Sequence, residues 1–114
     1  MVAMYGIPNC DTIKKARLWL AEHDVPYLFH NYKKEAPSTE LLASWVDVVG
    51  WELLLNKRGT TWRKLAEEEK QDIDAGKAIA LMSQNPSMIK RPVLIVDDHI
   101  EVGFSAQAYN GLLT

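Results

Sequence analysis

The sequence predicts a single α/β domain over residues 1–114, with a mixed four-stranded sheet and a helical insert at about residues 37–88. Two observations carry this prediction. A short apolar run at Val2–Ile7 is followed by an amphipathic helical pattern and then by a second strand-like run. A further group of strand and helix signals, at residues 93–113, ends the sequence, whereas the residues between the two groups have helical periods and helix caps.

The N-terminal group begins with Val2–Ile7, a short apolar run closed by Pro8, which is typical of a buried strand. After Cys10 the apolar residues recur with the period of a two-sided helix, which Asp24 ends. The stretch Val25–Tyr32 alternates between apolar and polar residues, so a second strand is expected there. These elements form a βαβ unit, and Cys10 lies at the junction between its first strand and its helix.

The insert has no strand-like run of comparable strength and is predicted to be helical. Its first helix begins near Pro37, where a following serine offers a capping hydroxyl and an early glutamate suits the positive end of a helix. Thr60 or Thr61 is expected to cap a shorter helix. The expected helices span residues 37–50, 62–69 and about 73–83, and the segment 51–55 is too short to assign.

The C-terminal group contains the strongest strand signal of the sequence, Val93–Val96, introduced by a proline. Asp97–His99 is expected to form a hairpin turn to a second strand, Ile100–Val102, and a closing helix is predicted over Ser105–Leu113. The predicted order is therefore βαβ, a helical insert and ββα. This order is the thioredoxin-like layout with an enlarged helical middle.

Composition excludes several classes of protein. The single cysteine, Cys10, has no partner for an internal disulfide, and the histidines His23, His30 and His99 are too scattered for a structural zinc site. A formal net charge of -2 offers no electrostatic basis for binding nucleic acid. No window approaches the ~20 apolar residues of a membrane helix, and no targeting segment is recognised. A lone thiol suits a reducing compartment, so a cytoplasmic location is expected.

Cys10 is the first candidate for chemistry. A thiol becomes a good nucleophile only as the thiolate, which a helix N-terminus stabilises through its unpaired N–H groups and dipole. The alternative is a small apolar residue in the core, which is what free cysteine usually is. The polar neighbours Asn9 and Asp11 favour an exposed loop and a reactive thiol. The hydroxyl of Thr12 either hydrogen-bonds the thiolate or merely caps the helix.

Two arginines are further candidates. Arg58 lies in the basic turn Asn56–Gly59, and Arg91 directly precedes the proline that opens the late strand. A guanidinium near a thiolate stabilises it and can also clamp an oxyanion or a peptide carboxylate with two hydrogen bonds. The alternative for each is a solvated surface arginine. None of the histidines has a spacing that suggests a Cys-His dyad, so no general base is assigned.

Four segments, in order along nearly the whole chain, form a recognisable set: Tyr5–Thr12, Asn56–Thr61, Ile89–Pro92 and Val102–Phe104. Together they resemble the glutaredoxin-linked arsenate reductase and Spx superfamily, most closely its YffB-like branch. The resemblance implies a thioredoxin-like fold with a helical insert, a nucleophilic cysteine at Cys10 and an assisting hydroxyl at Thr12. With Arg58 and Arg91, these are the predicted catalytic residues. The residues predicted to bind substrate or glutathione are Asn9, Asp11, Arg58, Arg91, Pro92 and Gly103.

The resemblance also identifies departures from the arsenate reductases. Arg58 and Arg91 match two of their three oxyanion-binding arginines, and Arg91 precedes a proline that the family keeps cis, here Pro92. The third arginine falls at Phe104, whose ring supplies neither charge nor hydrogen bonds. Ile13 stands where redox-sensing members have a resolving cysteine, so their internal disulfide is excluded.

The expected function is thus glutathione-dependent monothiol exchange, with no tightly bound cofactor and glutathione as co-substrate. Glutathione or a glutaredoxin-type reductant is the expected partner, and the backbone at Arg91–Pro92 is expected to pair with a bound peptide. The main alternative is an Spx-like regulator that docks on RNA polymerase without a redox switch, because Val102–Phe104 resembles the Spx ending. Arsenate reduction is a minor alternative.

Overall fold

The computed structural model describes residues 2–114 and contains a four-stranded sheet with helices between and after its strands. Only Met1, the first residue of the predicted domain, lies outside the described part. The strands are β1 (Val2–Gly6), β2 (Leu28–Asn31), β3 (Val93–Val96) and β4 (His99–Val102). The helices are α1 (Asp11–Glu22), α2 (Thr39–Val49), α3 (Trp51–Leu54), α4 (Thr60–Arg63), α5 (Glu67–Lys70), α6 (Ala75–Gln84), the 3-10 turn η1 (Pro86–Met88) and α7 (Ala106–Leu113).

The sheet is mixed, and its strand order is β2-β1-β3-β4. β1 and β2 are parallel, as a strand-helix-strand crossover through α1 requires, whereas β3 pairs antiparallel with both β1 and β4. A turn at Asp97 and Asp98 joins β3 to β4, and Asp97 has a positive φ of 53°. The predicted α/β class and thioredoxin-like layout are confirmed.

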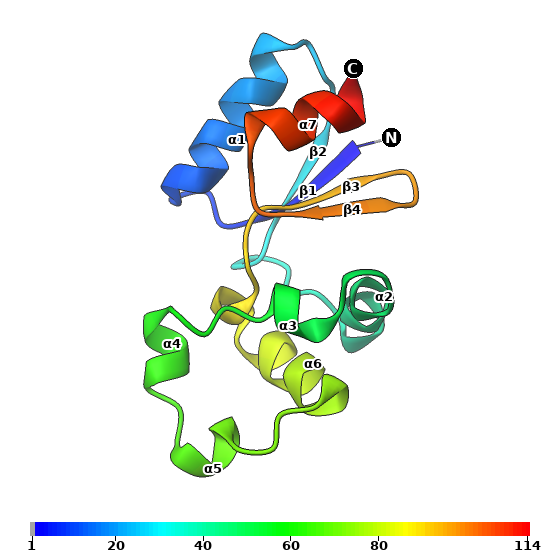
Figure 1. The fold of residues 1–114 in the computed structure, drawn as a ribbon. Coiled ribbons are helices and arrows are strands. Elements are labelled where there is room, and N and C mark those ends of the chain that lie inside the picture. Colours follow the sequence, from blue (N-terminus) through cyan, green and yellow to red (C-terminus); the bar gives the residue numbers. More distant parts are fainter. Residues whose placement is uncertain (1) are drawn as a thin grey trace. The chain divides into compact units, whose positions relative to one another are not determined.

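Contacts divide the chain into two compact units. We call the residues up to Glu35 together with Arg91–Thr114 the sheet unit, and Ala36–Lys90 the helical unit. The sheet unit contains all four strands, α1 and α7 (Figure 1). Among residues 2–114, no helix is both long and apolar enough to cross a membrane.

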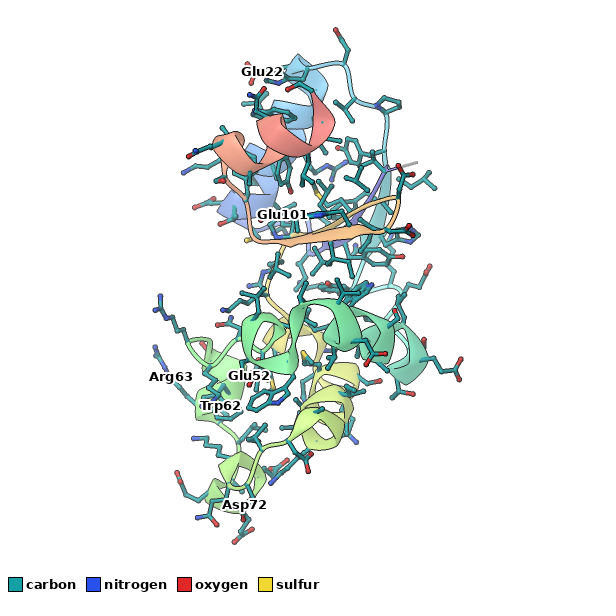
Figure 2. The ribbon with its side chains drawn as sticks, turned by 45° about the vertical axis from the view of Figure 1, so that its right-hand side comes forward. Glu22, Glu52, Trp62, Arg63, Asp72 and Glu101 are labelled. Carbon is teal, nitrogen blue, oxygen red and sulfur yellow. The ribbon has the colours of Figure 1, made fainter. Side chains whose placement is uncertain are left out.

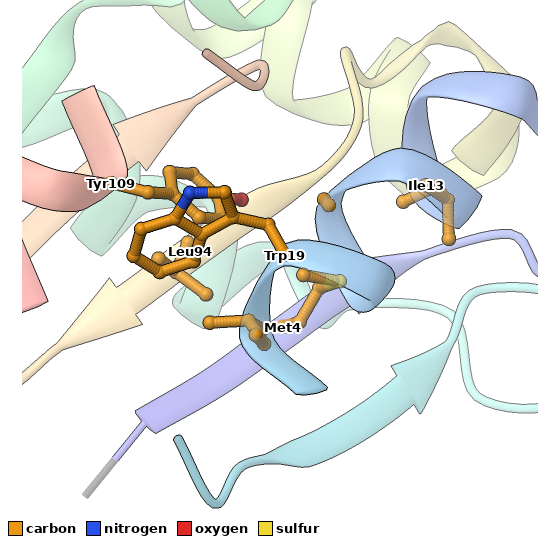
Figure 3. Packing of buried hydrophobic residues seen from close by; sticks show 7 residues of the cluster. Met4, Ile13, Trp19, Leu94 and Tyr109 are labelled. Carbon is orange, nitrogen blue, oxygen red and sulfur yellow. The ribbon is translucent and has the colours of Figure 1, made fainter. Parts of the chain in front are cut away.

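The core of the sheet unit lies between the sheet and its two helices (Figure 3). Met4 of β1 and Leu94 of β3 are register partners, and both are fully buried. Trp19 of α1 packs edge-to-face on Tyr109 of α7, with ring centroids 5.6 Å apart and planes at 90°. Ile13, Ala16 and Leu20 complete the buried face of α1. The first turn of α1 is therefore anchored to the sheet through Ile13.

The helical unit is built around α2 and α6, which contact each other. Both helices are capped by side chains: Ser38 accepts a hydrogen bond from the backbone N–H of Leu41, and Asp74 accepts one from that of Lys77. The buried residues of this unit include Leu42, Trp45, Leu54, Leu55, Ala78, Leu81, Met82, Met88 and Ile89.

Several predicted boundaries were wrong. β2 begins at Leu28 rather than Val25, because Val25 donates its N–H to the Leu20 carbonyl, 2.9 Å away, and thereby closes α1. The predicted helix 62–69 is two helices, α4 and α5. Leu65 donates to the carbonyl of Trp62 and ends the first, and the carboxylates of residues 67–69 lie at the N-terminal end of the second, where the helix dipole favours them.

Two helix starts also differ from the prediction. α4 begins at Thr60 and its N-cap is Gly59, so neither threonine is the cap. α6 starts at Ala75, two residues later than expected, because Asp74 is its cap. The unassigned segment 51–55 forms the single-turn helix α3, followed by a bridge between Leu55 and Ile89.

Candidate functional site around Cys10

Cys10 is delivered to the N-terminus of α1 by the loop that follows β1. It is the N-cap residue, with extended backbone angles of φ -108° and ψ 133°, and its carbonyl accepts the first helical hydrogen bond from Lys14 at 3.0 Å. The thiol is free and partly exposed. The sequence predicted this junction, and it leaves the sulfur next to the unpaired N–H groups of the first helical turn.

Gly6 is what allows α1 to approach the end of β1 so closely. A Cβ atom at Gly6 would collide with Cδ1 of Ile13, and it would lie 3.7 Å from Cβ of Arg91. The Ile13 side chain is fully buried at this point, and the Cβ atom of Arg91, from which its side chain extends, lies near the same position. Because residue 6 has no side chain, β1, α1 and the segment before β3 can approach one another closely near Cys10.

The electrostatic environment of Cys10 favours the thiolate. Partial burial raises the pKa of Cys10, but the backbone N–H of Ile13, a hydrogen bond from the Arg91 side chain and the backbone N–H of Thr12 lower it, and the positive charge of Arg91 acts in the same direction. The pKa of Cys10 is consequently lower than that of an ordinary thiol. Cys10 is itself the N-cap residue of α1, and its side chain forms no capping hydrogen bond, so these backbone N–H groups act on the sulfur through their dipoles.

Arg91 and Pro92 are fixed at the start of β3. Their peptide bond is cis, as the resemblance implied. The Pro92 carbonyl accepts a hydrogen bond of 2.8 Å from the backbone N–H of Gly103, which follows β4 and has a φ of 84°. A non-glycine residue would be strained at that φ. Gly103, which was predicted to bind substrate, thus helps to hold the segment that carries Arg91 in place.

The other residues of this loop that were predicted to belong to the site differ in exposure and in their effect on Cys10. Asn9 and Asp11 are exposed, and Asp11 is the acidic residue of the first turn of α1. The backbone N–H of Thr12 lowers the pKa of Cys10. Among residues 2–114, its hydroxyl has no hydrogen-bond partner and does not cap α1, so the backbone of Thr12 is the part of the residue that acts on Cys10.

Arg58 belongs to the helical unit and is not among the groups that the sheet unit assembles around Cys10. Its side chain is exposed. Its backbone N–H donates to Oδ1 of Asn56 at 3.1 Å, and its carbonyl accepts from Nη2 of Arg63 at 3.2 Å. These contacts fix the backbone of the basic turn while leaving the Arg58 guanidinium available to a ligand.

Phe104, which the resemblance places where the arsenate reductases have their third arginine, is a packing residue. Its ring lies edge-to-face on Tyr109, at a centroid distance of 4.8 Å. The hydroxyl of Tyr109 is buried without a hydrogen-bond partner within residues 2–114, and burial raises the pKa of Tyr109. An arginine at position 104 would have to replace these aromatic contacts.

An effect of Ile13 on Cys10 was not predicted from the sequence, where Ile13 stood in the apolar pattern of the first helix and at the place of an absent thiol. Its side chain anchors α1, and its backbone N–H lowers the pKa of Cys10. The available signal was positional, because the residue three places after an N-cap normally offers its N–H to the capping group. No group of three or more His, Cys, Asp or Glu side chains in the described part of the chain is arranged to hold a metal ion.

A cysteine at the first strand-helix junction of a thioredoxin-like fold, with an arginine beside it, is the arrangement that the resemblance to the arsenate reductase-like proteins implied. The chain belongs to the ArsC family, whose model matches residues 5–112. The family resemblance drawn from the sequence is thereby confirmed.

Three relatives illustrate the range of this family. The solved structure of the YFFB (PA3664) protein superposes with a TM-score of 0.97 and 50% identity over 100% of both chains. An uncharacterized protein of Haemophilus influenzae is 39% identical over 96% of this chain and 96% of its own. The global transcriptional regulator Spx of Listeria innocua is 29% identical over 92% of this chain and 81% of its own.

Proposed function

We propose that the protein is a glutathione-dependent monothiol reductase that acts through Cys10. One observation carries the proposal: Cys10 lies at the N-terminus of α1, where a hydrogen bond from Arg91 and two backbone N–H groups lower its pKa. A thiol with a lowered pKa has a larger fraction of thiolate at neutral pH, and the thiolate is the nucleophile in disulfide exchange.

The proposed reaction has three exchange steps. The Cys10 thiolate attacks one sulfur of a substrate disulfide, so that a mixed disulfide with Cys10 forms, the substrate S–S bond breaks, and the other sulfur leaves as a thiolate. A glutathione thiolate then attacks the Cys10 sulfur of the mixed disulfide, so that the second substrate sulfur leaves as a thiolate and Cys10 is joined to glutathione. A second glutathione thiolate attacks the glutathione sulfur of this disulfide, so that glutathione disulfide forms and Cys10 leaves as a thiolate.

The chain cannot resolve the mixed disulfide itself, because Cys10 is its one cysteine. Ile13, at the position where a resolving thiol would lie, is fully buried in the core. The reductant must therefore be another molecule, and we propose glutathione or a glutaredoxin-type protein. Arg58 and Arg91 would bind its carboxylates, an extended peptide would pair with the backbone at Arg91–Pro92, and the lone thiol suits a cytoplasmic location.

Mass spectrometry tests this proposal directly. Incubation of the reduced protein with glutathione disulfide is expected to add one glutathionyl group on Cys10, and Cys10→Ser is expected to remain unmodified. A control glutaredoxin establishes that the conditions allow exchange. An unmodified wild-type protein under conditions that modify the control would refute the proposal.

A second candidate is regulation of transcription by binding RNA polymerase, without a redox switch. The similarity to proteins named global transcriptional regulator Spx favours it. A pull-down from a bacterial lysate separates the two functions: stoichiometric polymerase subunit retained by Cys10→Ser would favour binding over catalysis. Arsenate reduction is the least favoured candidate, since Phe104 packs on Tyr109 instead of supplying a third arginine, and no arsenate-dependent thiol oxidation above buffer is expected.

A further inference from the structure

The helical unit contains a pocket of about 350 Å³ whose wall is rich in charge. It is lined by Glu52, Leu55, Asn56, Lys57, Arg58 and Lys90. Three of these side chains are cations and one is a carboxylate, although the chain as a whole carries a formal net charge of -2. The pocket therefore concentrates positive charge locally and offers one negative group beside it.

Backbone hydrogen bonds hold the two sides of this pocket together. Asn56 donates its N–H to the Met88 carbonyl at 2.7 Å, and Lys90 donates its N–H to the Leu54 carbonyl at 2.8 Å. Between these bonds, Leu55 and Ile89 form an antiparallel bridge and are buried. The basic turn and Lys90 are thus fixed beside each other by the fold, although they are far apart in the sequence.

The ammonium group of Lys57 is held between two aromatic rings. Its Nζ lies 5.6 Å from the ring centroid of Trp51 and 5.5 Å from that of Trp62, within the range of cation-π attraction. Figure 2 shows Glu52 and Trp62 among the side chains of this unit. Within residues 2–114, neither Lys57 nor Lys90 nor Glu52 forms an ion pair, so these charges are available to a ligand.

The mixture of charges restricts the class of ligand. A multiply charged anion such as a phosphate would be attracted by the lysines but repelled by Glu52. A group that carries both a carboxylate and an ammonium satisfies both signs. Glutathione has such a group at its γ-glutamyl end, where a free α-carboxylate and a free α-amino group share one carbon.

We propose that this pocket binds the free amino-acid end of glutathione, with Lys57 and Lys90 on the carboxylate and Glu52 on the ammonium. The inference rests on the proposed use of glutathione as reductant and assigns residues to its recognition. It adds Glu52, Lys57 and Lys90 to Arg58, and it makes Trp51 and Trp62 positioning residues for Lys57.

Calorimetric titration of the intact, reduced protein with S-methylglutathione tests the pocket without thiol exchange, because this ligand has no free thiol. Lys57→Gln and Lys90→Gln are each expected to weaken binding about fivefold, the upper range for a solvent-exposed charge contact. Lys64→Gln is the matched control, since Lys64 is an exposed lysine of the same unit outside the pocket wall, and its affinity is expected to equal that of the wild type.

The role of Glu52 is tested by changing both partners. Glu52→Gln is expected to weaken binding of S-methylglutathione, and N-acetylation of the ligand, which removes the ammonium charge, is expected to weaken binding to the wild type. The two changes together are expected to cost no more than either alone, because they remove the same contact. Additive losses would exclude the assignment of Glu52.

The pocket and the proposed function can fail separately. If Lys57→Gln and Lys90→Gln bind S-methylglutathione as the wild type does, or if the wild type does not bind it, the pocket assignment is wrong, whereas formation of the Cys10 adduct would still support the function. If the wild type binds S-methylglutathione through these residues but Cys10 forms no adduct, the pocket assignment stands and the monothiol function is wrong.

Discussion

The sheet unit and the helical unit present their functional groups in different ways. In the sheet unit, a buried core made of residues from both ends of the chain fixes one strand-helix junction, and the reactive group is a single thiol whose pKa is lowered by its surroundings. In the helical unit, short helices and turns display several charged side chains around one pocket. The sheet unit thus holds the thiol, and the helical unit holds the pocket that we propose to bind the amino-acid end of glutathione.

The largest effect is expected from the thiol itself. Cys10→Ser removes the nucleophile while keeping a side chain that can cap α1, so exchange activity with glutathione disulfide is expected to vanish and the fold to remain. Mass spectrometry and circular dichroism check the two halves of this expectation. If the division between the units is correct, Cys10→Ser also keeps its affinity for S-methylglutathione; a loss of that affinity would break it.

The core of the sheet unit comes next in expected effect. Leu94 is fully buried between the strands and helices, so Leu94→Ala is expected to lower the free energy of unfolding by about 2–5 kcal/mol, as for other large-to-small substitutions in a core. Leu18→Ala is the matched control, since Leu18 is 60% exposed on α1, and a change within about 0.5 kcal/mol is expected. Denaturant unfolding measures both. Similar losses for the two variants would contradict the core as described.

Substitution of Arg91 tests whether its hydrogen bond and its charge stabilise the Cys10 thiolate. Arg91→Met keeps an unbranched stem beside Gly6 but removes a hydrogen bond and a positive charge that lower the pKa of Cys10. The pKa of Cys10 should therefore rise, a smaller fraction of thiolate should be present at neutral pH, and alkylation should become several-fold slower there. The pH dependence of alkylation is the measurement.

For the wild type, the pH at which alkylation of Cys10 is half-maximal is expected to lie below the pKa of ~8.5 of free cysteine. For Arg91→Met this midpoint is expected to lie above the wild-type midpoint. At pH values well above both midpoints the rates should converge, because the thiol is ionised in both proteins. Arg63→Met, an exposed arginine of the helical unit, is expected to leave the midpoint unchanged. Coincident profiles for wild type and Arg91→Met would show that Arg91 does not stabilise the thiolate.

The smallest effect is expected from the aromatic support of Lys57. Trp62→Leu removes one of the two rings beside the ammonium group and is expected to weaken binding of S-methylglutathione about two- to fivefold, the size of an exposed cation-π contact. In a Lys57→Gln background the same substitution should have no further effect. Equal losses in both backgrounds would mean that Trp62 acts on the pocket without Lys57.

Local patterns predicted the sheet unit better than the short helices of the other unit. The strands at Val93–Val96 and Val2–Gly6 were found because buried strands are continuous apolar runs with clear terminators. The division of residues 60–70 into two helices was missed, because in single-turn helices the hydrophobic period is too short to show a break. There the ends are set by individual hydrogen bonds.

The sequence alone determines the position of Cys10, the absence of a second thiol from the chain and the family of the chain. Helix starts, residue identity and motif order are local properties that can be read along the sequence. Only the tertiary structure decided which groups act on the sulfur. The contact of Arg91 with Cys10 depends on the pairing of β1 with β3, and the placement of Lys57 and Lys90 in one pocket wall depends on the bridge between Leu55 and Ile89. The fit of Ile13 against Gly6 and the packing of Phe104 on Tyr109 depend on how α1 and α7 pack. The contact of Arg91 with Cys10 and the placement of Lys57 beside Lys90 join residues distant in the sequence, and no local pattern encodes their distances.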